Sequence, residues 1–408
     1  MAYKSLFLLL FTLTHLFELA LHLVQARSAS NPTPANVADV YDPDTYQRWR
    51  SYHGEKNRLA ILRTLVSWAL TMLLLSLNLH AWAAGLFHDT VLMQLLGVVL
   101  FQTLAETLVF LGFAWVNTMV IEQKYGFNRA TVRTFVMDQL RSLLLEVLLG
   151  TVLMGLLAWL HLSMGDWVVV LFTGAVFLLT LAISFLYGPV FSRMGNKFVP
   201  LAEGELKEKL MALLTKHGYQ VKAIEVMDAS RRNTKLNAYF TGFGRLKTIV
   251  LYDNLLQAMT PDEICAVFAH ELGHGLNRDV LKQQCMNLGN LLLMAIAVWL
   301  TVRTPVMHTA FGFAGVNYGF AFVLLSGLLG LIQPLTGMGM NAYSRHAEYR
   351  ADAQAVREGF GPALTGALKK LARENFSNLA PSPLLVLLEY SHPPLSERIA
   401  AIEKALKH

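Results

Sequence analysis

The sequence predicts a mainly α, polytopic membrane protein that also carries a small α+β domain outside the bilayer. Three observations support this fold class. Of the 408 residues, 54% are hydrophobic and only 15% are charged, whereas soluble domains carry about 25% charge. Seven segments are apolar over the length of about 20 residues that spans the hydrocarbon core. Two stretches of soluble composition, 191–284 and 339–408, together have the size of one ordinary domain.

The apolar segments define the predicted spans, which are 5–24, 59–87, 90–121, 143–164, 167–190, 285–304 and 318–338. Several exceed the minimum length, so we expect tilted helices or ends that project past the bilayer. The chain then divides into four parts, which are 1–190 with five spans, 191–284, 285–338 with two spans, and 339–408. Because two spans interrupt the extramembrane domain, we expect it to lie against the membrane face.

The basic residues predict the orientation. Of the 34 Lys and Arg, 31 lie in the stretches 25–58, 122–142, 191–284 and 339–408. Seven spans place all four stretches on one side, which the positive-inside rule makes cytoplasmic. A cleaved signal peptide at the N-terminus is the alternative, but it would put these charges on the wrong side. The net charge of +6 therefore reflects membrane topology, and we expect no nucleic-acid partner.

Polar residues inside the predicted spans allow two interpretations. They are Glu18, Arg63, His80, Gln102, Glu106, Asn117 and Glu146. Such groups face the interior of a helix bundle, where they either pair with one another or line a hydrated space. The two cysteines, Cys265 and Cys285, are too few for a disulfide framework or a zinc ribbon. We expect both to be buried as small apolar residues.

A helix is predicted from residue 261 onward. Thr260 and Glu263 have the spacing of a capping box, Pro261 takes the first helical position, and apolar residues fill 264–269. The strongest chemical motif of the chain, HELGH at 270–274, follows on the same helix.

This motif predicts a zinc site. His270 and His274 are four residues apart and project from one face of a helix. Both imidazoles can therefore reach one zinc ion at about 2.0–2.1 Å. Glu271 lies beside them, where it can take a proton from a water molecule that the metal activates.

A catalytic zinc needs a third protein ligand and an open position. The best candidate lies beyond the last span, in SRHAEYRAD at 344–352. Glu348 and Asp352 share a helical face, so Glu348 can complete the coordination while Asp352 holds a ligand histidine by its free ring nitrogen. His346 is a rival ligand that lies off this face. Pairing of both carboxylates with neighbouring arginines is the purely structural alternative.

Two further segments are candidates for substrate contacts. Residues 223–253 predict strands with a turn at 242–245, and LNAYFTG at 236–242 precedes the turn. An edge strand beside a metal helix can hold an extended peptide by main-chain hydrogen bonds, although a purely structural hairpin remains an alternative. Near the C-terminus, two prolines after His392 predict a rigid turn before a final helix. His392 is either an oxyanion donor or an ordinary surface or capping residue.

Together these motifs resemble the type I CAAX prenyl protease family of integral-membrane zinc metallopeptidases. The resemblance rests on HELGH at 270–274, SRHAEYRAD at 344–352, NAYFTG at 237–242 and HPPLSERI at 392–399. EQKYGFN at 122–128 and NKFVPL at 196–201 add weaker support. The motifs stand in the family's order, and the resemblance covers nearly the whole chain.

The resemblance implies seven helices around a hydrated chamber, with one zinc ion facing inward beneath a cytoplasmic domain. It also implies a peptide or protein substrate, from which eukaryotic members remove the last three residues after a prenylated cysteine. The implied ligands are His270, His274 and Glu348, with Glu271 as the base. Asp352 matches a position of the family that is assigned either as an acid or as a carboxylate that contacts a metal ligand rather than the metal. The implied substrate contacts are Asn237, Ala238, His392 and Arg398.

Some residues depart from the eukaryotic pattern. Gly275 replaces a tryptophan, Lys235 and Leu236 replace a His-Ser pair, and the C-terminus lacks a dilysine signal. These departures favour a bacterial member in the inner membrane, with a substrate that need not be prenylated, over an enzyme of the endoplasmic reticulum. The rival functions are a membrane quality-control protease of broad specificity, whose known family has fewer spans, and a non-catalytic scaffold, receptor or transporter.

Overall fold

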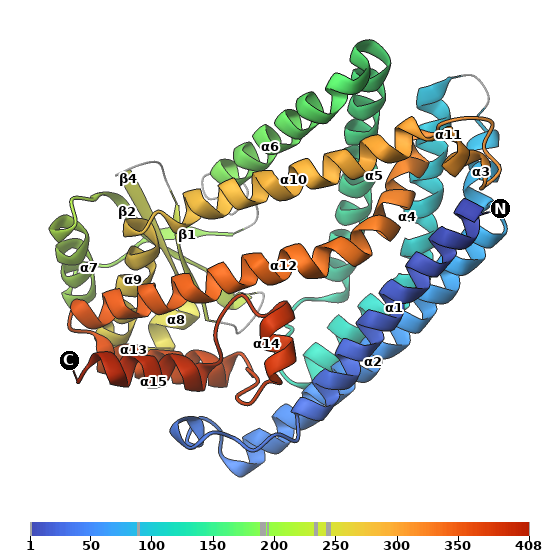
Figure 1. Ribbon diagram of the computed structural model, residues 1–408. Helices are drawn as coiled ribbons and strands as arrows, with labels where there is room; N and C mark the ends of the chain where they lie inside the picture. The colour runs from blue at the N-terminus through green and yellow to red at the C-terminus, as the bar shows by residue number, and fades with distance from the viewer. Residues whose placement is uncertain are drawn as a thin grey trace.

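The computed structural model describes residues 2–87, 90–187, 193, 196–231, 236–241 and 246–407. The first half of the chain contains α1 (Ala2–Ser28), η1 (Ala35–Val37), α2 (Pro43–Ser76), α3 (Leu79–Gly85), α4 (Val91–Trp115), η2 (Val116–Glu122), α5 (Val132–Met164), η3 (Gly165–Trp167) and α6 (Val168–Tyr187). The second half contains β1 (Phe198–Pro200), α7 (Glu205–Lys216), β2 (Gln220–Met227), η5 (Ala229–Arg231), β3 (Ala238–Thr241), β4 (Leu246–Tyr252), α8 (Asp253–Ala258), α9 (Pro261–Leu276), α10 (Asp279–Arg303), α11 (Pro305–Thr309), α12 (Tyr318–Arg357), α13 (Gly361–Glu374), α14 (Pro383–Glu389) and α15 (Leu395–Ala405). The sheet and α7 to α9 gather at one end of α10 and α12, and α11 lies at the other end (Figure 1).

The apolar segments form the long helices that the sequence predicts. The seven predicted spans lie in α1, α2, α4, α5, α6, α10 and α12, although residues 188–190 of the fifth span lie outside the described residues. Six helical stretches of the described chain are long and apolar enough to cross a membrane, because α5 and α6 are joined through η3 into one stretch, Val132–Ser184. The predicted mainly α membrane fold with a small sheet is therefore confirmed.

The predicted span at 59–87 is not one helix. It begins inside α2, which starts at Pro43, and α2 ends at Ser76. Asn78 then adopts a left-handed backbone conformation with φ of 55°, which stops the helix, and α3 packs against α4. Lys4 stabilises the chain between α2 and α3. It donates hydrogen bonds to the Ser76 carbonyl and to Asn78 Oδ1, both at 2.8 Å.

The last predicted span continues far beyond its apolar part. α12 comprises 40 residues and passes through Pro334 without ending, so it is roughly 60 Å long at 1.5 Å per residue. Its first half is apolar, and its second half contains the 344–352 motif. The helix therefore joins the membrane part of the molecule directly to the extramembrane domain.

The sheet has four strands in the order β1-β2-β4-β3. β2 and β4 are parallel, β1 pairs antiparallel with β2, and β3 pairs antiparallel with β4 from Ala238 opposite Leu251 to Thr241 opposite Thr248. β3 is thus an edge strand, as predicted for the segment before the turn. The turn at 242–245 lies outside the described residues.

The core of the extramembrane domain surrounds α9. Side chains of α7, the sheet, α13 and α15 pack around it, and Cys265 is fully buried there, as expected. Cys285, in contrast, is exposed on α10. The expectation that both cysteines are buried was wrong, because residue 285 lies on an outer face of a membrane helix rather than in this core.

The polar residues of the spans show both predicted behaviours. His80 Nε2 lies 2.6 Å from Gln102 Oε1, and Gln102 Nε2 donates to Glu106 Oε1 at 2.5 Å. Glu106 also lines a cavity of about 550 Å³ between α2, α4 and α5, together with Arg63 and Glu146. Some of these groups therefore bind one another, and others face a polar space between the helices.

Candidate active site

The sequence ahead of the zinc motif holds α9 in place. The predicted capping box is present, because Thr260 Oγ1 accepts from the Glu263 amide at 3.3 Å and Glu263 Oε2 accepts from the Thr260 amide at 2.8 Å. Lys370 of α13 also donates to Glu263 Oε2 at 2.7 Å. Most of the apolar residues that follow are buried. One face of α9 therefore packs in the core, and this packing fixes the side on which the motif is presented.

A glycine sets the distance between α9 and α12. A Cβ atom added to Gly273 would lie 2.8 Å from Ala351 Cα and 3.0 Å from Gln354 Cβ, closer than side chains can approach. The small residue within the HELGH motif therefore lets the two helices touch at the level of the histidines.

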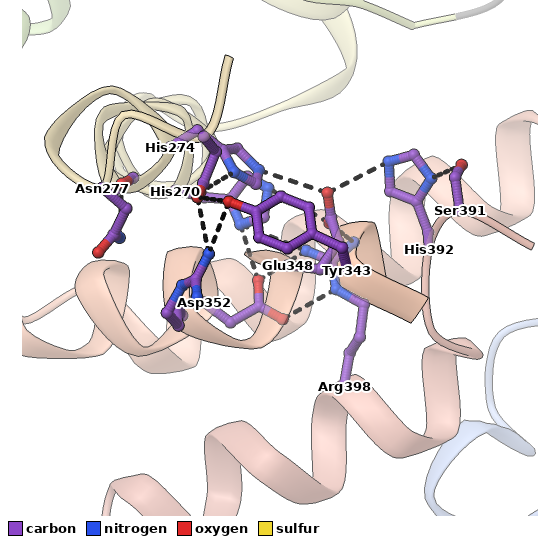
Figure 2. A network of polar contacts seen from close by, with 12 residues as sticks. His270, His274, Asn277, Tyr343, Glu348, Asp352, Ser391, His392 and Arg398 are labelled. Carbon is purple, nitrogen blue, oxygen red and sulfur yellow. Dashed lines mark hydrogen bonds and ion pairs between the residues drawn. The ribbon is translucent and has the colours of Figure 1, made fainter. Parts of the chain in front are cut away.

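This contact brings the predicted ligands together. The ligand atoms of His270, His274 and Glu348 all lie within 4.8 Å of one another. His270 Nε2 is 3.5 Å from Glu348 Oε2, and His274 Nε2 is 3.3 Å from Glu348 Oε1. Figure 2 shows both imidazoles projecting from α9 toward the carboxylate on α12. His346, the rival ligand, is exposed and does not belong to this group.

The other ring nitrogen of each histidine is also bound. His270 Nδ1 lies 2.8 Å from Asp352 Oδ1, and His274 Nδ1 lies 3.1 Å from Asp279 Oδ2. Carboxylates in this position fix the orientation of metal-binding imidazoles and raise their basicity. Both Nε2 atoms therefore point into the group with their lone pairs available.

Asp279 is the member of the site that sequence reasoning missed. Arg278, with φ of 53°, ends α9 in the left-handed region and starts α10, so Asp279 turns back toward His274. Tyr343 and Arg350 of α12 also donate to Asp279 Oδ1, at 2.8 and 2.7 Å. The only signal in the sequence is that Asp279 begins a new helix shortly after the motif, which does not by itself predict this contact.

Arg398 binds the carboxylates of α12. Its Nε donates to Asp352 Oδ2 at 2.9 Å, its Nη2 donates to Asp352 Oδ1 at 2.6 Å, and its Nη1 lies 3.2 Å from Glu348 Oε2. The side chain is buried, with 8% of its surface exposed. Such a two-pronged ion pair offsets the charge of both acids and fixes their orientation.

The group fits a divalent cation. Two imidazole nitrogens and one carboxylate form a donor set that zinc sites use. Buried Glu348 Oε2 has Arg398 as an ion-pair partner but makes no well-aligned hydrogen bond within the described residues, so it can still donate a lone pair to a metal. Burial alone would lower the pKa of His274, but hydrogen bonds with the Glu348 and Asp279 carboxylates raise it to about 9. These carboxylates therefore favour positive charge at the centre of the group.

The group opens into a cavity of about 590 Å³. Its lining includes His270, Glu271, Glu348, His392 and Arg398, with Asn237 and Ala238 at the start of the edge strand β3. The predicted site residues from four separate segments thus meet around one space. His274 and Asp352 are not among its lining residues, and Asp352 lies behind His270.

His392 reaches the group from the turn before α15. Its Nε2 lies 3.3 Å from Glu348 Oε1, and its Nδ1 lies 2.9 Å from Ser391 Oγ. Its side chain is 64% exposed, whereas His270 and Glu348 are buried and His274 is partly buried. His392 is therefore more open to solvent than the three predicted ligands, and Figure 2 shows its ring beside Glu348.

Comparison with known proteins agrees with this architecture. The model of peptidase family M48 matches residues 200–406, and a model described as CAAX prenyl protease N-terminal, five membrane helices, matches residues 5–193. The chain is 31% identical to a CAAX prenyl protease 1 homolog of Oryza sativa subsp. japonica, over 96% of this chain and 95% of that protein. It is 30% identical to CAAX prenyl protease 1 of Saccharomyces cerevisiae, over 91% of this chain and 88% of that protein.

The fold also matches a solved structure. The crystal structure of S. mikatae Ste24p matches with a TM-score of 0.91 and 26% identity, covering 98% of this chain and 99% of that one. The resemblance that the motifs predict is confirmed, and so is a metalloprotease embedded in the membrane. This chain belongs to peptidase family M48.

Proposed function

We propose that this chain is a zinc endopeptidase that binds one zinc ion through His270, His274 and Glu348. The convergence of these three ligands within 4.8 Å, with the far ring nitrogens bound to Asp352 and Asp279, is the observation that supports this proposal most strongly. Three protein ligands leave a position open, as catalytic zinc sites require. When bound, zinc would supply Lewis-acid chemistry toward the scissile carbonyl and a water molecule.

The side chains of the cavity supply the proton transfers. Glu271 takes a proton from the attacking water and later delivers it to the leaving amine. His392, protonated on Nε2, and the Asn237 amide are the proposed donors to the oxyanion that develops on the substrate. Arg398 lines the cavity, but its guanidinium is already paired with Asp352. We therefore assign it to positioning of the acids rather than to direct binding of substrate.

The proposed substrate is a membrane-associated peptide or protein that ends in a CAAX sequence, from which the last three residues are removed after a prenylated cysteine. The peptide would lie extended along the edge strand, with Asn237 and Ala238 against its backbone. The relatives named CAAX prenyl protease 1 in rice and yeast support this choice. The alternative is an unprenylated substrate, and the enzyme would then be a membrane protease of broad specificity.

We also propose that the extramembrane domain faces the cytoplasm. The basic stretches flanking the spans support this side through the positive-inside rule. Labelling of a cysteine introduced on the domain surface would be ambiguous, because Cys285 is already exposed. An epitope tag at the C-terminus, probed in sealed and in permeabilised vesicles, tests the same sidedness without a thiol reagent.

The decisive experiment compares wild type with Glu271→Gln on a fluorogenic CAAX peptide, with and without a farnesyl group. Zinc content is measured for both proteins. We expect one zinc in each and a loss of about 10³- to 10⁴-fold in kcat for the variant, because the proton acceptor is removed and the ligands are not. Better cleavage of the farnesylated peptide would support the prenyl-protease activity.

Other outcomes select the rival functions. Equal cleavage of both peptides by wild type would keep the mechanism and indicate a protease of broad specificity. Failure of wild type to bind zinc and to cut either peptide would refute the catalytic proposal and favour a scaffold.

A further inference from the structure

The chain that carries His392 is tied to α12, the helix that also supplies Glu348. His392 lies in the short connection between α14 and α15, two residues after Tyr390. We propose that Arg345 of α12 is a positioning residue, which holds this connection so that His392 stays beside the metal group. The inference rests on the proposed function, because it takes His392 as a donor to the oxyanion.

Arg345 binds the end of α14 through main-chain oxygens. Its Nη1 donates to the Val386 carbonyl at 2.7 Å and to the Tyr390 carbonyl at 2.6 Å. The last carbonyls of a helix have no partner within the helix, and a positive charge is favourable beside them. Hydrogen bonds from a charged donor are also stronger than those between neutral groups. Arg345 therefore fixes the point at which the chain leaves α14 and continues to His392.

The ties to α14 and the proposed metal ligand lie on one side of α12. Asn341 Nδ2 donates to the Leu388 carbonyl at 2.9 Å, which adds a second tie to the end of α14. Four polar side chains of α12 share this side, because they recur at intervals of four, three and four residues. They are Asn341, Arg345, Glu348 and Asp352. The helix that supplies the third ligand thus also holds the end of α14.

The far end of the connection is bound to the same helix. Tyr349 of α12 donates to Glu397 Oε2 at 2.9 Å, at the start of α15. One residue later, Arg398 donates twice to Asp352. The connection therefore has ties to α12 on both sides of His392, and its position is set relative to the helix of Glu348.

The imidazole of His392 is held less firmly than the backbone around it. Its side chain is 64% exposed, whereas Pro393 and Pro394, which follow it, are buried. Packing fixes an exposed ring only weakly, so the distance of 3.3 Å from His392 Nε2 to Glu348 Oε1 depends on where the backbone lies. Arg345 is the charged group that binds this backbone on its N-terminal side.

The position of the donor matters more than its presence. A donor stabilises an oxyanion when it lies about 2.7–3.1 Å from the place where that oxygen develops. A displacement of about 1 Å by a mutation outside the reacting centre is enough to lose much of this benefit. Loss of Arg345 should therefore reproduce part of the effect of losing His392, at the same step of the reaction.

The first test compares Arg345→Met with wild type on the farnesylated CAAX peptide. Methionine keeps an unbranched side chain and removes the donor. We expect kcat to fall about 10-fold while KM stays within about 2-fold, because the oxyanion exists only in the transition state. Zinc content should not change, since the ligands remain. A fall in zinc content, or a rise in KM with unchanged kcat, would contradict the positioning role.

Two further variants serve as controls. Arg345→Lys keeps a charged donor and should retain kcat within about 3-fold of wild type. Arg357→Met removes an arginine of the same helix that donates to Gln354, and it should leave both kcat and KM unchanged. An equal loss of kcat in Arg345→Met and Arg357→Met would show a general effect on α12 and overturn the proposal.

A double-mutant cycle tests whether Arg345 acts through His392. His392→Ala should lower kcat by about 10²- to 10³-fold, as for the loss of one oxyanion donor. In the His392→Ala protein, adding Arg345→Met should lower kcat by less than about 2-fold, because the group that it positions is already gone. If Arg345→Met costs the same factor with and without His392, it acts independently of His392 and the proposal is overturned.

A spin label measures the positioning without catalysis. The label is attached to His392→Cys in a Cys285→Ser protein, because Cys285 is exposed whereas Cys265 is fully buried. The electron paramagnetic resonance spectrum should show a more mobile label when Arg345→Met is added, and no change when Arg357→Met is added. Unchanged mobility with Arg345→Met would refute the positioning role.

These readouts separate the inference from the proposed function. If wild type cuts no peptide and Arg345→Met still releases the label, the proposed function fails and the positioning of residue 392 stands. If wild type cuts the peptide and Arg345→Met leaves kcat unchanged, the inference alone fails.

Discussion

The two helices that carry the ligand group differ in almost every physical respect. α9 has 16 residues, a capping box at its start and a buried apolar face within one domain. α12 has 40 residues, begins as an apolar membrane helix and passes through a proline before it reaches Glu348. One helix is positioned by its own sequence and immediate core, and the other by its role as a membrane span.

This difference shows how the site is linked to the membrane. Of the most apolar 18 residues of α12, 39% are buried inside the molecule. The corresponding share is 17% in both α1 and α2. α12 is therefore the most enclosed of these three helices, and it carries the proposed ligand Glu348 toward its far end. A displacement of α12 would move Glu348 relative to the histidines of α9.

The largest expected effect comes from removing the contribution of α12 to the metal. Glu348→Ala should weaken metal binding by more than about 100-fold, because even partners behind the ligands contribute 10- to 100-fold. Activity should fall in parallel. Metal content after dialysis and kcat/KM measure both.

Glu358→Ala is the matched control for this change. Glu358 follows the same helix and binds Lys216 and His217 of the α7 region, away from the site. Retention of metal in Glu348→Ala, or its loss in Glu358→Ala, would contradict the assignment of Glu348 as the third ligand.

The next effect separates the carboxylates behind the two histidines. Asp352→Asn and Asp279→Asn should each weaken metal binding by about 10- to 100-fold, since each removes a charged partner of a ligand imidazole. Asp352→Asn should be the more harmful, because it also leaves buried Arg398 without its two-pronged partner. Competition with a chelator and thermal melting provide the two readouts. A larger loss in Asp279→Asn would reverse this ranking.

A smaller effect should come from the crossing point of the two helices. Gly273→Ala places a methyl group against Ala351 and Gln354, which should cost about 1–3 kcal/mol of stability and separate the ligands. We expect kcat/KM to fall by about 10-fold. Gly275→Ala is the control, since its methyl meets only the hydroxyl end of Tyr219 at 3.1 Å. Equal activities of the two variants would show that the crossing distance does not control the site.

The smallest effect concerns the start of α9. Glu263→Gln weakens the capping box and the pair with Lys370, and it should cost about 1 kcal/mol without changing kcat. Burial raises the pKa of Glu263, but hydrogen bonds from Lys370 and Thr260 outweigh it and hold the pKa below its usual range. This contribution is therefore complete above the unfolded pKa of about 4.3 and is lost as pH falls below it.

Thermal melting of both proteins from about pH 7 to about pH 4 measures this effect. The deficit of the variant should be largest near neutral pH and should shrink at the acid end. A deficit that is independent of pH would mean that the charge of Glu263 contributes nothing.

Much of this molecule follows from local sequence. The apolar segments, the capping box at Thr260 and the histidine pair of α9 depend on spacing within one helix, where residues four apart share a face. Glu348 and Asp352 were predicted as a pair on the same grounds. One prediction among the spans was wrong, that of a single helix over 59–87. Apolar composition does not reveal that Asn78 adopts the left-handed conformation that ends α2.

The sequence by itself determined which side chains are presented together on each helix, and with them the membrane fold and the proposed metal donors. The tertiary structure alone decided which of those faces meet. It pairs His270 with Asp352, 82 positions away, turns Asp279 toward His274, and brings Trp49 near the start of α2 onto the Phe376 carbonyl after α13. The physical reason is that periodicity records the direction of a side chain within its own helix. Contacts between distant segments depend instead on how closely those helices pack, which at this site is set by Gly273.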